Sequence, residues 1–267
     1  MERIGEVLRA QALPARRPEW ATPPSSESDS ESWRQHLARA SAYNAFRLSN
    51  LHRRHWSASL REVQPLDHQR VAMRVLAAWL DEFERGYRER RYPAWGIVLG
   101  SPGPGAGKTH LARALAAEVC RRGKLACMVT EPGLMDELRE AQRPESDVGI
   151  VQVRQRYVRA PLLVIDDLGK ARVSEFVAET MFQIVNGREE AGLPIIATTN
   201  LEPDQIAERY GPLYGPYIVS RLVGMCRLSA GGAPVSTWVV MDGPDLRAAG
   251  EVTWDGGWGR DTHHRGV

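Results

Sequence analysis

The sequence predicts an α/β fold built on a parallel sheet that helices cover on both faces. From about residue 66 onward, short apolar runs alternate with segments of helical periodicity. The runs are apolar at nearly every position, which is typical of strands buried on both faces of a parallel sheet. A glycine-rich turn also joins the first run to a helical segment, as phosphate-binding loops do.

The order of these elements follows the hydrophobic pattern along the chain. Helical spacing of apolar residues begins at 67–87, before the first strand. Beyond the fourth strand, two short β-like runs at 226–230 and 236–243 flank a turn of Gly, Ala and Pro. The expected strands cover 96–100, 124–130, 161–167 and 193–200. The expected helices cover 67–87, 109–122, 133–142 and 173–190.

The first 60 residues differ in composition from the rest of the chain. Residues 14–31 are rich in Pro, Ser and charge, which predicts a disordered linker. Residues 32–57 are helical in pattern and interleave arginines with aromatic side chains. Such a segment either binds nucleic acid or a partner protein, or packs on the next domain. We therefore divide the chain into a helical N-terminal segment (1–60), an α/β domain (61–247) and a flexible tail (248–267).

Composition sets limits on the classes of function. The 267 residues are 43% hydrophobic with a net charge of +2, so the chain can bury a sizeable core and has no global attraction to nucleic acid. Its three cysteines have no metal-like spacing. No apolar run approaches the ~20 residues that a membrane-spanning helix needs. The first residues also lack the apolar core of a secretory signal, so we expect a cytoplasmic protein without membrane association.

The turn after the first strand predicts a phosphate site. Its backbone N–H groups and the dipole of the following helix favour an anion. Lys108 is positioned to reach the β- and γ-phosphates of a nucleotide, and the Thr109 hydroxyl to hold Mg²⁺. The chain has only 3 lysines against 32 arginines, which makes a lysine here unlikely to be background. The candidate contacts are Gly103, Gly105, Ala106, Gly107, Lys108, Thr109 and His110.

The spacing of this loop departs from the usual pattern. G-x-x-x-x-G-K-[ST] requires glycine five residues before Gly107, and that residue is Pro102. Gly100 lies two residues too early. Either the loop carries an insertion of two residues, or Gly103 and Gly105 replace the first glycine.

Two further strands end in polar side chains. Asp166 and Asp167 close the third strand, at the edge where open α/β sheets bind ligands. Asp166 is the expected Mg²⁺ carboxylate, and Asp167 is the candidate for orienting the attacking water. The fourth strand ends at Asn200, which either faces the γ-phosphate and that water or merely caps the next helix. Because the phosphate loop and the Asp166–Asp167 strand end precede Asn200 in the chain, we favour its contact with the γ-phosphate and water.

One arginine is a candidate for action across a subunit boundary. Arg221 lies in a helical stretch with apolar neighbours on both sides. Such a residue is able to stabilise charge on the phosphoryl group that a neighbouring subunit transfers. Arg188 and Arg227 are weaker candidates for the same role.

These motifs, in this order, resemble the AAA+ ATPases, and more narrowly the DnaC/DnaI helicase loaders and the related IstB transposition ATPases. The resemblance covers residues 64–247 and rests on GKTHLARALA, VIDDLGK, IIATTNL, SRLVGMCR and GPDLR. It implies a P-loop three-layer sandwich with strand order 5-1-4-3-2 and little or no helical lid. It also implies ATP and Mg²⁺ as cofactors, Asp167 and Asn200 as catalytic residues, and Arg221 as an arginine finger.

The resemblance implies a slow ATPase that loads a replicative helicase in DNA replication. The N-terminal segment would hold the helicase, and the ATPase domains would assemble with ATP between them on single-stranded DNA. The aspartate in place of glutamate at Asp167 suggests slow hydrolysis. The residues expected to face DNA are Arg139, Arg143, Arg154, Arg156 and Arg159. The alternative is that these arginines form a solvated helix face.

Two alternatives remain open from the sequence. The first is an IstB-like ATPase that assembles on duplex DNA and recruits a transposase. The second is an ATP-dependent adaptor or chaperone without a nucleic-acid role, which the modest net charge permits.

Overall fold

The computed structural model describes residues 30–87, 91–228 and 234–246, and its centre is a five-stranded sheet. The strand order is β2-β3-β4-β1-β7, and every neighbouring pair is parallel. Numbered as the five strands of the sheet, this is the predicted order 5-1-4-3-2 read from the other edge. The strands are β1 (Ile97–Gly100), β2 (Ala126–Thr130), β3 (Leu162–Leu168), β4 (Ile195–Thr199) and β7 (Trp238–Val240).

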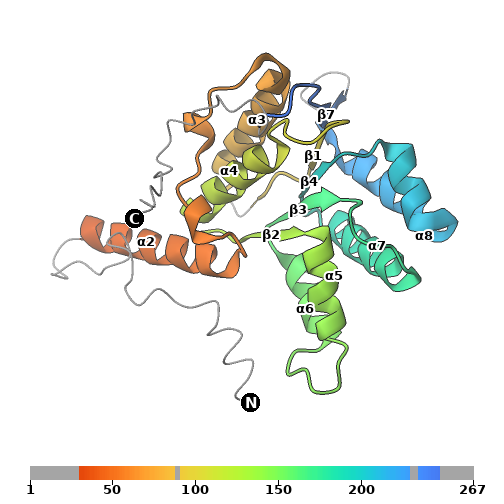
Figure 1. Cartoon of the computed structure of the whole chain (residues 1–267). Coiled ribbons are helices and arrows are strands. Elements are labelled where there is room, and N and C mark those ends of the chain that lie inside the picture. The colour runs from red at the N-terminus through yellow and green to blue at the C-terminus, as the bar shows by residue number, and fades with distance from the viewer. Residues whose placement is uncertain (1–29, 88–90, 229–233, 247–267) are drawn as a thin grey trace, which may run out of the picture.

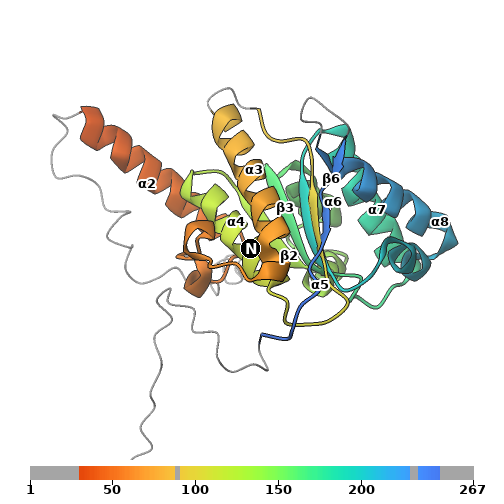
Figure 2. The same ribbon diagram turned by 90° about the horizontal axis from the view of Figure 1, so that it is seen from above.

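Helices cover both faces of this sheet, which confirms the three-layer prediction (Figures 1 and 2). One layer contains α3 (Arg70–Tyr87) and α4 (Lys108–Arg121), with α2 (Ser30–Leu48) packed on α4. The other layer contains α5 (Glu131–Glu140), α6 (Ile150–Arg159), α7 (Glu175–Glu190) and α8 (Pro203–Met225). None of the described helices is long and apolar enough to cross a bilayer.

Side chains of each strand alternate between two hydrophobic clusters. In β3, Leu162 and Val164 pack against α4, whereas Leu163 and Ile165 pack into the cluster beneath α5 to α8. The same alternation holds in β1, β2 and β4. Because both faces of the sheet are buried, nearly every strand position is apolar. This explains the continuous apolar runs in the sequence.

The N-terminal segment packs on the α/β domain as far as it is described. Tyr43 and Phe46 on α2 are buried, and the Phe46 ring stacks on Trp56 with centroids 4.9 Å apart. Leu51 and Leu60 belong to the cluster around α4. These aromatic residues therefore serve packing, one of the two roles left open by the sequence. Most of the expected linker (14–31) and the tail (248–267) lie outside the described residues.

The structure departs from the predicted elements in three places. The expected N-terminal helix ends at Leu48, and the short 3₁₀ turns η2 (Arg53–His55), η3 (Leu60–Glu62) and η4 (Asp67–Gln69) connect it to α3. Helix α6 was not predicted, and of α8 only the stretch around Arg221 was predicted. The β-like run expected at 226–230 contains β5 (Arg227–Leu228), which pairs with β6 (Val235–Ser236) in a two-stranded antiparallel ribbon, and the run expected at 236–243 is divided between β6 and β7.

The chain after β7 returns to the loop between β1 and α4. Met241 N–H donates to the Gly100 carbonyl over 2.8 Å, and Leu246 N–H donates to the Gly105 carbonyl over 3.2 Å. From 241 to 246, where the description ends, the chain forms no helix. This short strap therefore lies against the predicted phosphate loop.

Candidate nucleotide-binding site

The loop between β1 and α4 depends on two glycines. Gly105 and Gly107 have φ of 82° and 91°, a region that L-residues with side chains avoid. A Cβ at Gly105 would lie 1.8 Å from Asp245 Oδ1 in the strap. Gly103, in contrast, has open space where a Cβ would stand. Of the two glycines proposed to replace the missing first one, Gly105 is therefore the one whose backbone requires glycine.

Helix α4 begins directly after this loop and directs donors toward it. Gly107 is its N-cap residue and supplies no side-chain cap, so the amides of the first turn depend on another acceptor. Lys108 is 6% exposed, and its ammonium donates to the Gly103 carbonyl over 3.1 Å. The helix start thus combines amide groups, a positive dipole end and an ammonium, which together favour an anion.

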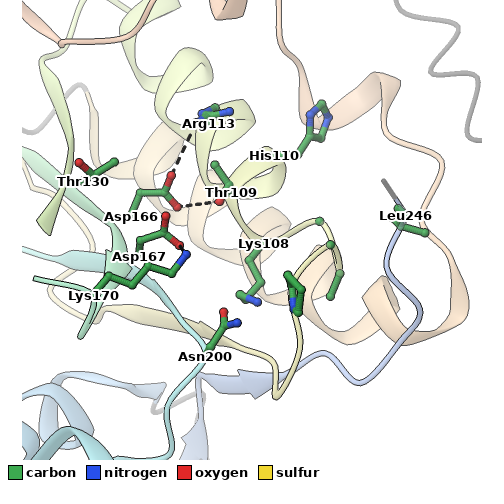
Figure 3. Close-up of a pocket in the computed structure, with 14 residues that line it drawn as sticks. Lys108, Thr109, His110, Arg113, Thr130, Asp166, Asp167, Lys170, Asn200 and Leu246 are labelled. Carbon is green, nitrogen blue, oxygen red and sulfur yellow. Dashed lines mark hydrogen bonds and ion pairs between the residues drawn. The ribbon is translucent and has the colours of Figure 1, made fainter. Parts of the chain in front are cut away.

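Asp166 lies at the carboxyl end of β3, in register with Thr130 of β2. Its Oδ1 accepts hydrogen bonds from the Thr109 hydroxyl over 2.8 Å and the Thr198 hydroxyl over 2.6 Å. Its Oδ2 lies 3.6 Å from the Arg113 guanidinium (Figure 3). Thr109 and Asp166 are far apart in the sequence but in contact in the fold. This is the arrangement predicted for two ligands of one cation.

Asp167 adopts an unusual backbone conformation beside Asp166. Its φ is 60°, and the pairing of β3 with β4 is irregular between Ile165 and Leu168. The Asp167 N–H donates to the Thr198 hydroxyl over 2.9 Å, and its Oδ1 lies 2.7 Å from the Lys170 ammonium. The bulge directs both neighbouring aspartates toward one cavity, although residues in a regular strand alternate between faces.

A cavity of about 440 Å³ joins these groups. Its lining includes the loop and helix start from Gly105 to His110, both aspartates and Asn200, which follows β4 (Figure 3). Burial, aided by the Arg113 charge, lowers the pKa of His110 and favours its neutral form. All the predicted phosphate, metal and catalytic positions except Gly103 and Arg221 line this single cavity.

The donor set suits a magnesium–triphosphate group. Mg²⁺ prefers oxygen ligands and is held by one or two protein groups together with phosphate oxygens. Thr109 and Asp166 supply a hydroxyl and a carboxylate oxygen 2.8 Å apart. Among the described residues, no cluster of three or more His, Cys, Asp or Glu side chains offers a site made by protein alone. The α4 amides and Lys108 supply the complementary positive groups.

The candidate arginine finger lies elsewhere. Arg221 on α8 donates from Nε to Asn186 Oδ1 over 2.7 Å and pairs with Glu189 over 3.2 Å. Its guanidinium stands 5.1 Å from the Phe182 ring centroid. Arg221 does not line the cavity of its own chain.

The weaker candidate Arg188 is ruled out as a finger. It is fully buried, and its guanidinium donates to the carbonyls of Tyr157, Val158, Ala160 and Pro194. These bonds fix it between the ends of α6 and α7, so it cannot reach a second subunit. Arg227, on β5, is exposed.

The arginines expected to face DNA lie on or beside α5 and α6, which pack side by side (Figure 1). Arg139 and Arg143 form exposed ion pairs with Asp136 and Glu140. Arg154 bonds to Gln183, and Arg156 bonds to Glu137 and Tyr157. Arg159 is exposed at the end of α6. Helix α6 carries three arginines and no acidic residue, whereas α5 carries one arginine against four acidic residues, so only α6 is basic.

Sequence reasoning missed several residues of the cavity and its support. Arg113, Thr130, Lys170 and Leu246 line the cavity, and Thr198 bonds to Asp166. Arg113 follows Thr109 by four residues, so helical spacing would have placed the two side chains on the same face. The roles of Thr130 and Thr198 depend on strand register, which the sequence did not indicate.

Comparison with known proteins agrees with this geometry. Residues 94–226 match the family described as "IstB-like ATP binding protein". This span contains the phosphate loop, both aspartates, Asn200 and Arg221. The chain matches the DnaC/IstB family of AAA+ ATP-binding proteins over this span.

Curated relatives of this AAA+ chain come from both branches of the family. A putative ATP-binding protein in an insertion sequence of Mycobacterium tuberculosis is 26% identical over 178 residues, 66% of this chain and 61% of the relative. The replicative helicase loader DnaC of Escherichia coli K12 is 30% identical over 108 residues, 40% of this chain and 44% of the loader. The chain thus matches about half the length of these relatives.

The fold of this AAA+ chain also matches a solved structure. The crystal structure of the DnaC helicase loader aligns with a TM-score of 0.55 and 22% sequence identity. The alignment covers 71% of this chain and 99% of that one. At this level of identity, the match supports the fold.

Proposed function

We propose that this protein binds ATP with Mg²⁺, hydrolyses it slowly and acts as a loader of a replicative helicase. The observation that carries the proposal is the meeting of Lys108, Thr109, Asp166, Asp167 and Asn200 around one cavity. The similarity to DnaC favours the loader branch, and so does the strand end TTNL, which resembles the loaders more than the IstB-type ATPases.

Five of the cavity residues share three tasks in this proposal. Lys108 and the α4 amides bind the phosphates, and Thr109 with Asp166 holds Mg²⁺, which neutralises phosphate charge. Asp167 and Asn200 orient the attacking water. In hydrolysis, the water oxygen forms a bond to the γ-phosphorus while the bond from that phosphorus to the β–γ bridging oxygen breaks. The short side chain of Asp167 and its pairing with Lys170 suit a low rate, and a slow ATPase suits a switch.

Assembly and partners form the second part of the proposal. Arg221 acts on the nucleotide of a neighbouring subunit, because in its own chain it contacts α7 instead of the cavity. The N-terminal segment (1–60) binds the helicase, and the arginines of α5 and α6 contact single-stranded DNA. The protein works in the cytoplasm.

A second function is favoured by a specific observation. The matching family is described as IstB-like, and one relative belongs to an insertion sequence. In that case the same ATPase would assemble on duplex DNA and recruit a transposase.

One experiment separates these functions. ATP hydrolysis and DNA binding are measured with a single-stranded oligonucleotide, with the duplex of the same sequence and without DNA, at two salt concentrations. A loader is expected to hydrolyse ATP weakly, to respond to the single strand and to co-purify with the replicative helicase. Phosphate contacts make such binding salt-dependent.

Other outcomes of the same experiment contradict the loader. A response to duplex alone, with transposase capture, favours the IstB-like function. No DNA binding at either salt concentration, with or without ATP, contradicts both DNA-dependent functions and favours an adaptor or chaperone.

A further inference from the structure

A buried carboxylate anchors the loop that follows the two aspartates. Glu131 is fully buried at the start of α5, and its Oε2 accepts hydrogen bonds from Gly169 N–H over 2.7 Å and Ala171 N–H over 2.9 Å. Its Oε1 accepts a hydrogen bond from the Tyr210 hydroxyl on α8. Gly169 has a φ of 88°, and a Cβ there would lie 2.4 Å from Leu201. The loop backbone is therefore fixed on both sides of Lys170.

Lys170 stands between these anchored residues and faces the cavity (Figure 3). Its N–H donates to the Asp167 carbonyl over 3.1 Å, and its ammonium lies 2.7 Å from Asp167 Oδ1. A side chain on a fixed backbone loses less entropy on pairing than one on a loose loop. The lysine and the candidate catalytic carboxylate thus form a preorganised ion pair at the rim of the cavity.

The ion pair with Lys170 restricts the ability of Asp167 to orient a water molecule. To orient a water molecule, a carboxylate needs an oxygen available to accept its hydrogen bond. The ammonium pairs with Oδ1 and compensates the negative charge of the group. The Asp167 backbone has a positive φ, and the hydrogen bond from its N–H to the Thr198 hydroxyl stabilises this conformation.

We propose that Lys170 is a positioning residue that restrains Asp167 and thereby slows ATP hydrolysis. The inference rests on the proposed function, in which Asp167 orients the attacking water. Lys170 acts on the hydrolytic step, whereas Lys108 and Thr109 act on binding. Such a restraint would prolong the ATP-bound state on which a switch depends.

Steady-state hydrolysis and ATP affinity of Lys170→Ala test the inference. We expect kcat to rise about two- to fivefold, the range that corresponds to a partly exposed ion pair. KM and the Kd for ATP should stay unchanged, and Lys170→Arg should retain the wild-type rate because it preserves the charge. Lys124→Ala is the matched control, since Lys124 lies outside the cavity, before β2, and should leave kcat unchanged.

A second background shows whether the effect passes through Asp167. In Asp167→Asn, the additional change Lys170→Ala should have no effect on kcat. An equal rise in both backgrounds would overturn the inference, as would an unchanged or lower kcat in Lys170→Ala alone. A weaker ATP affinity in Lys170→Ala would also overturn it, because Lys170 would then be a phosphate ligand.

The two proposals fail in distinguishable ways. A wild-type protein that binds ATP while neither it nor Lys170→Ala hydrolyses any would overturn the restraint and leave ATP binding intact. Absence of ATP binding by the wild type would overturn the proposed function first, and the restraint with it.

Discussion

At the scale of single residues, Glu118 shows how one carboxylate joins the N-terminal segment to the α/β domain. Its oxygens accept from the Ser59 hydroxyl over 2.7 Å and pair with Arg121 over 2.8 Å and Arg122 over 2.7 Å. Burial alone would raise the pKa of Glu118, but the three donors together outweigh it and lower the pKa to about 2. Arg121 also donates to the carbonyls of Trp56 and Ala58, which extends the same junction.

This shift predicts a specific dependence of stability on pH. Because the pKa of Glu118 is lower in the folded state, its ionised form stabilises the fold above about pH 4.5, and this contribution is lost as pH falls toward about 2. We expect Glu118→Gln to lower the free energy of unfolding at pH 7 by about 1–3 kcal/mol. The variant should also lose much of the wild-type dependence on pH across that acidic window. Urea denaturation at a series of pH values measures both effects.

A matched glutamate supplies the control for this measurement. Glu140 forms an exposed pair with Arg143, so Glu140→Gln should change stability by less than about 0.5 kcal/mol at any of these pH values. If Glu118→Gln keeps the full wild-type pH dependence, the Glu118 network does not stabilise this junction.

At the scale of elements, the sequence predicted best where both faces of an element are buried. The strand expected at 96–100 is Ile97–Gly100, and the other central strands were found with similar accuracy. Helix α6 was missed because arginine and glutamine make up half of its segment, and only Val153 and Tyr157 are buried in it. The N-terminal helix was predicted too long because its aromatic pattern continues beyond Leu48 into the 3₁₀ turns.

Some residues of the site were likewise predictable from the sequence and others were not. Spacing along the chain was enough to nominate Lys108, Thr109 and Asp166, since a strand–loop–helix unit determines where such residues lie. Thr198 and Glu131 were beyond reach, because their partners lie 32 to 40 residues away in sequence and meet them only in the folded state. The pairing of Lys170 with Asp167 depends on a bulge and a positive φ that the sequence did not predict.

At the scale of the whole molecule, the position of Arg221 bears on assembly. A finger that serves a neighbouring subunit requires head-to-tail contacts, which leave each cavity beside another subunit's arginine. Among the described residues, Arg221 bonds to Asn186 and Glu189 on α7 and to the Tyr217 carbonyl on its own helix. The proposed ATPase is therefore expected to be inactive as an isolated subunit.

Mixing two inactive variants tests this arrangement. Lys108→Ala lacks the phosphate lysine and Arg221→Ala lacks the finger, so each alone should hydrolyse little ATP. In an equimolar mixture, about a quarter of the head-to-tail interfaces would pair an intact cavity with an intact finger. Hydrolysis by the mixture should recover to roughly that fraction of the wild-type rate. Lys108→Ala mixed with Asp166→Asn is the control and should recover none, because both changes damage the cavity. Failure of the first mixture to recover would place the action of Arg221 within its own chain or outside catalysis.

The proposed function and the role proposed for Lys170 both depend on a nucleotide site built around Lys108. The most direct measurement is the equilibrium Kd of ATP with Mg²⁺ for the wild type, for Lys108→Ala and for the control Lys124→Ala. The buried ammonium should contribute about 1.5–3 kcal/mol through charge-assisted bonds, so Lys108→Ala should weaken binding about tenfold or more while Lys124→Ala binds as the wild type does. Equal affinity in all three proteins would contradict the assignment of this cavity as the ATP site.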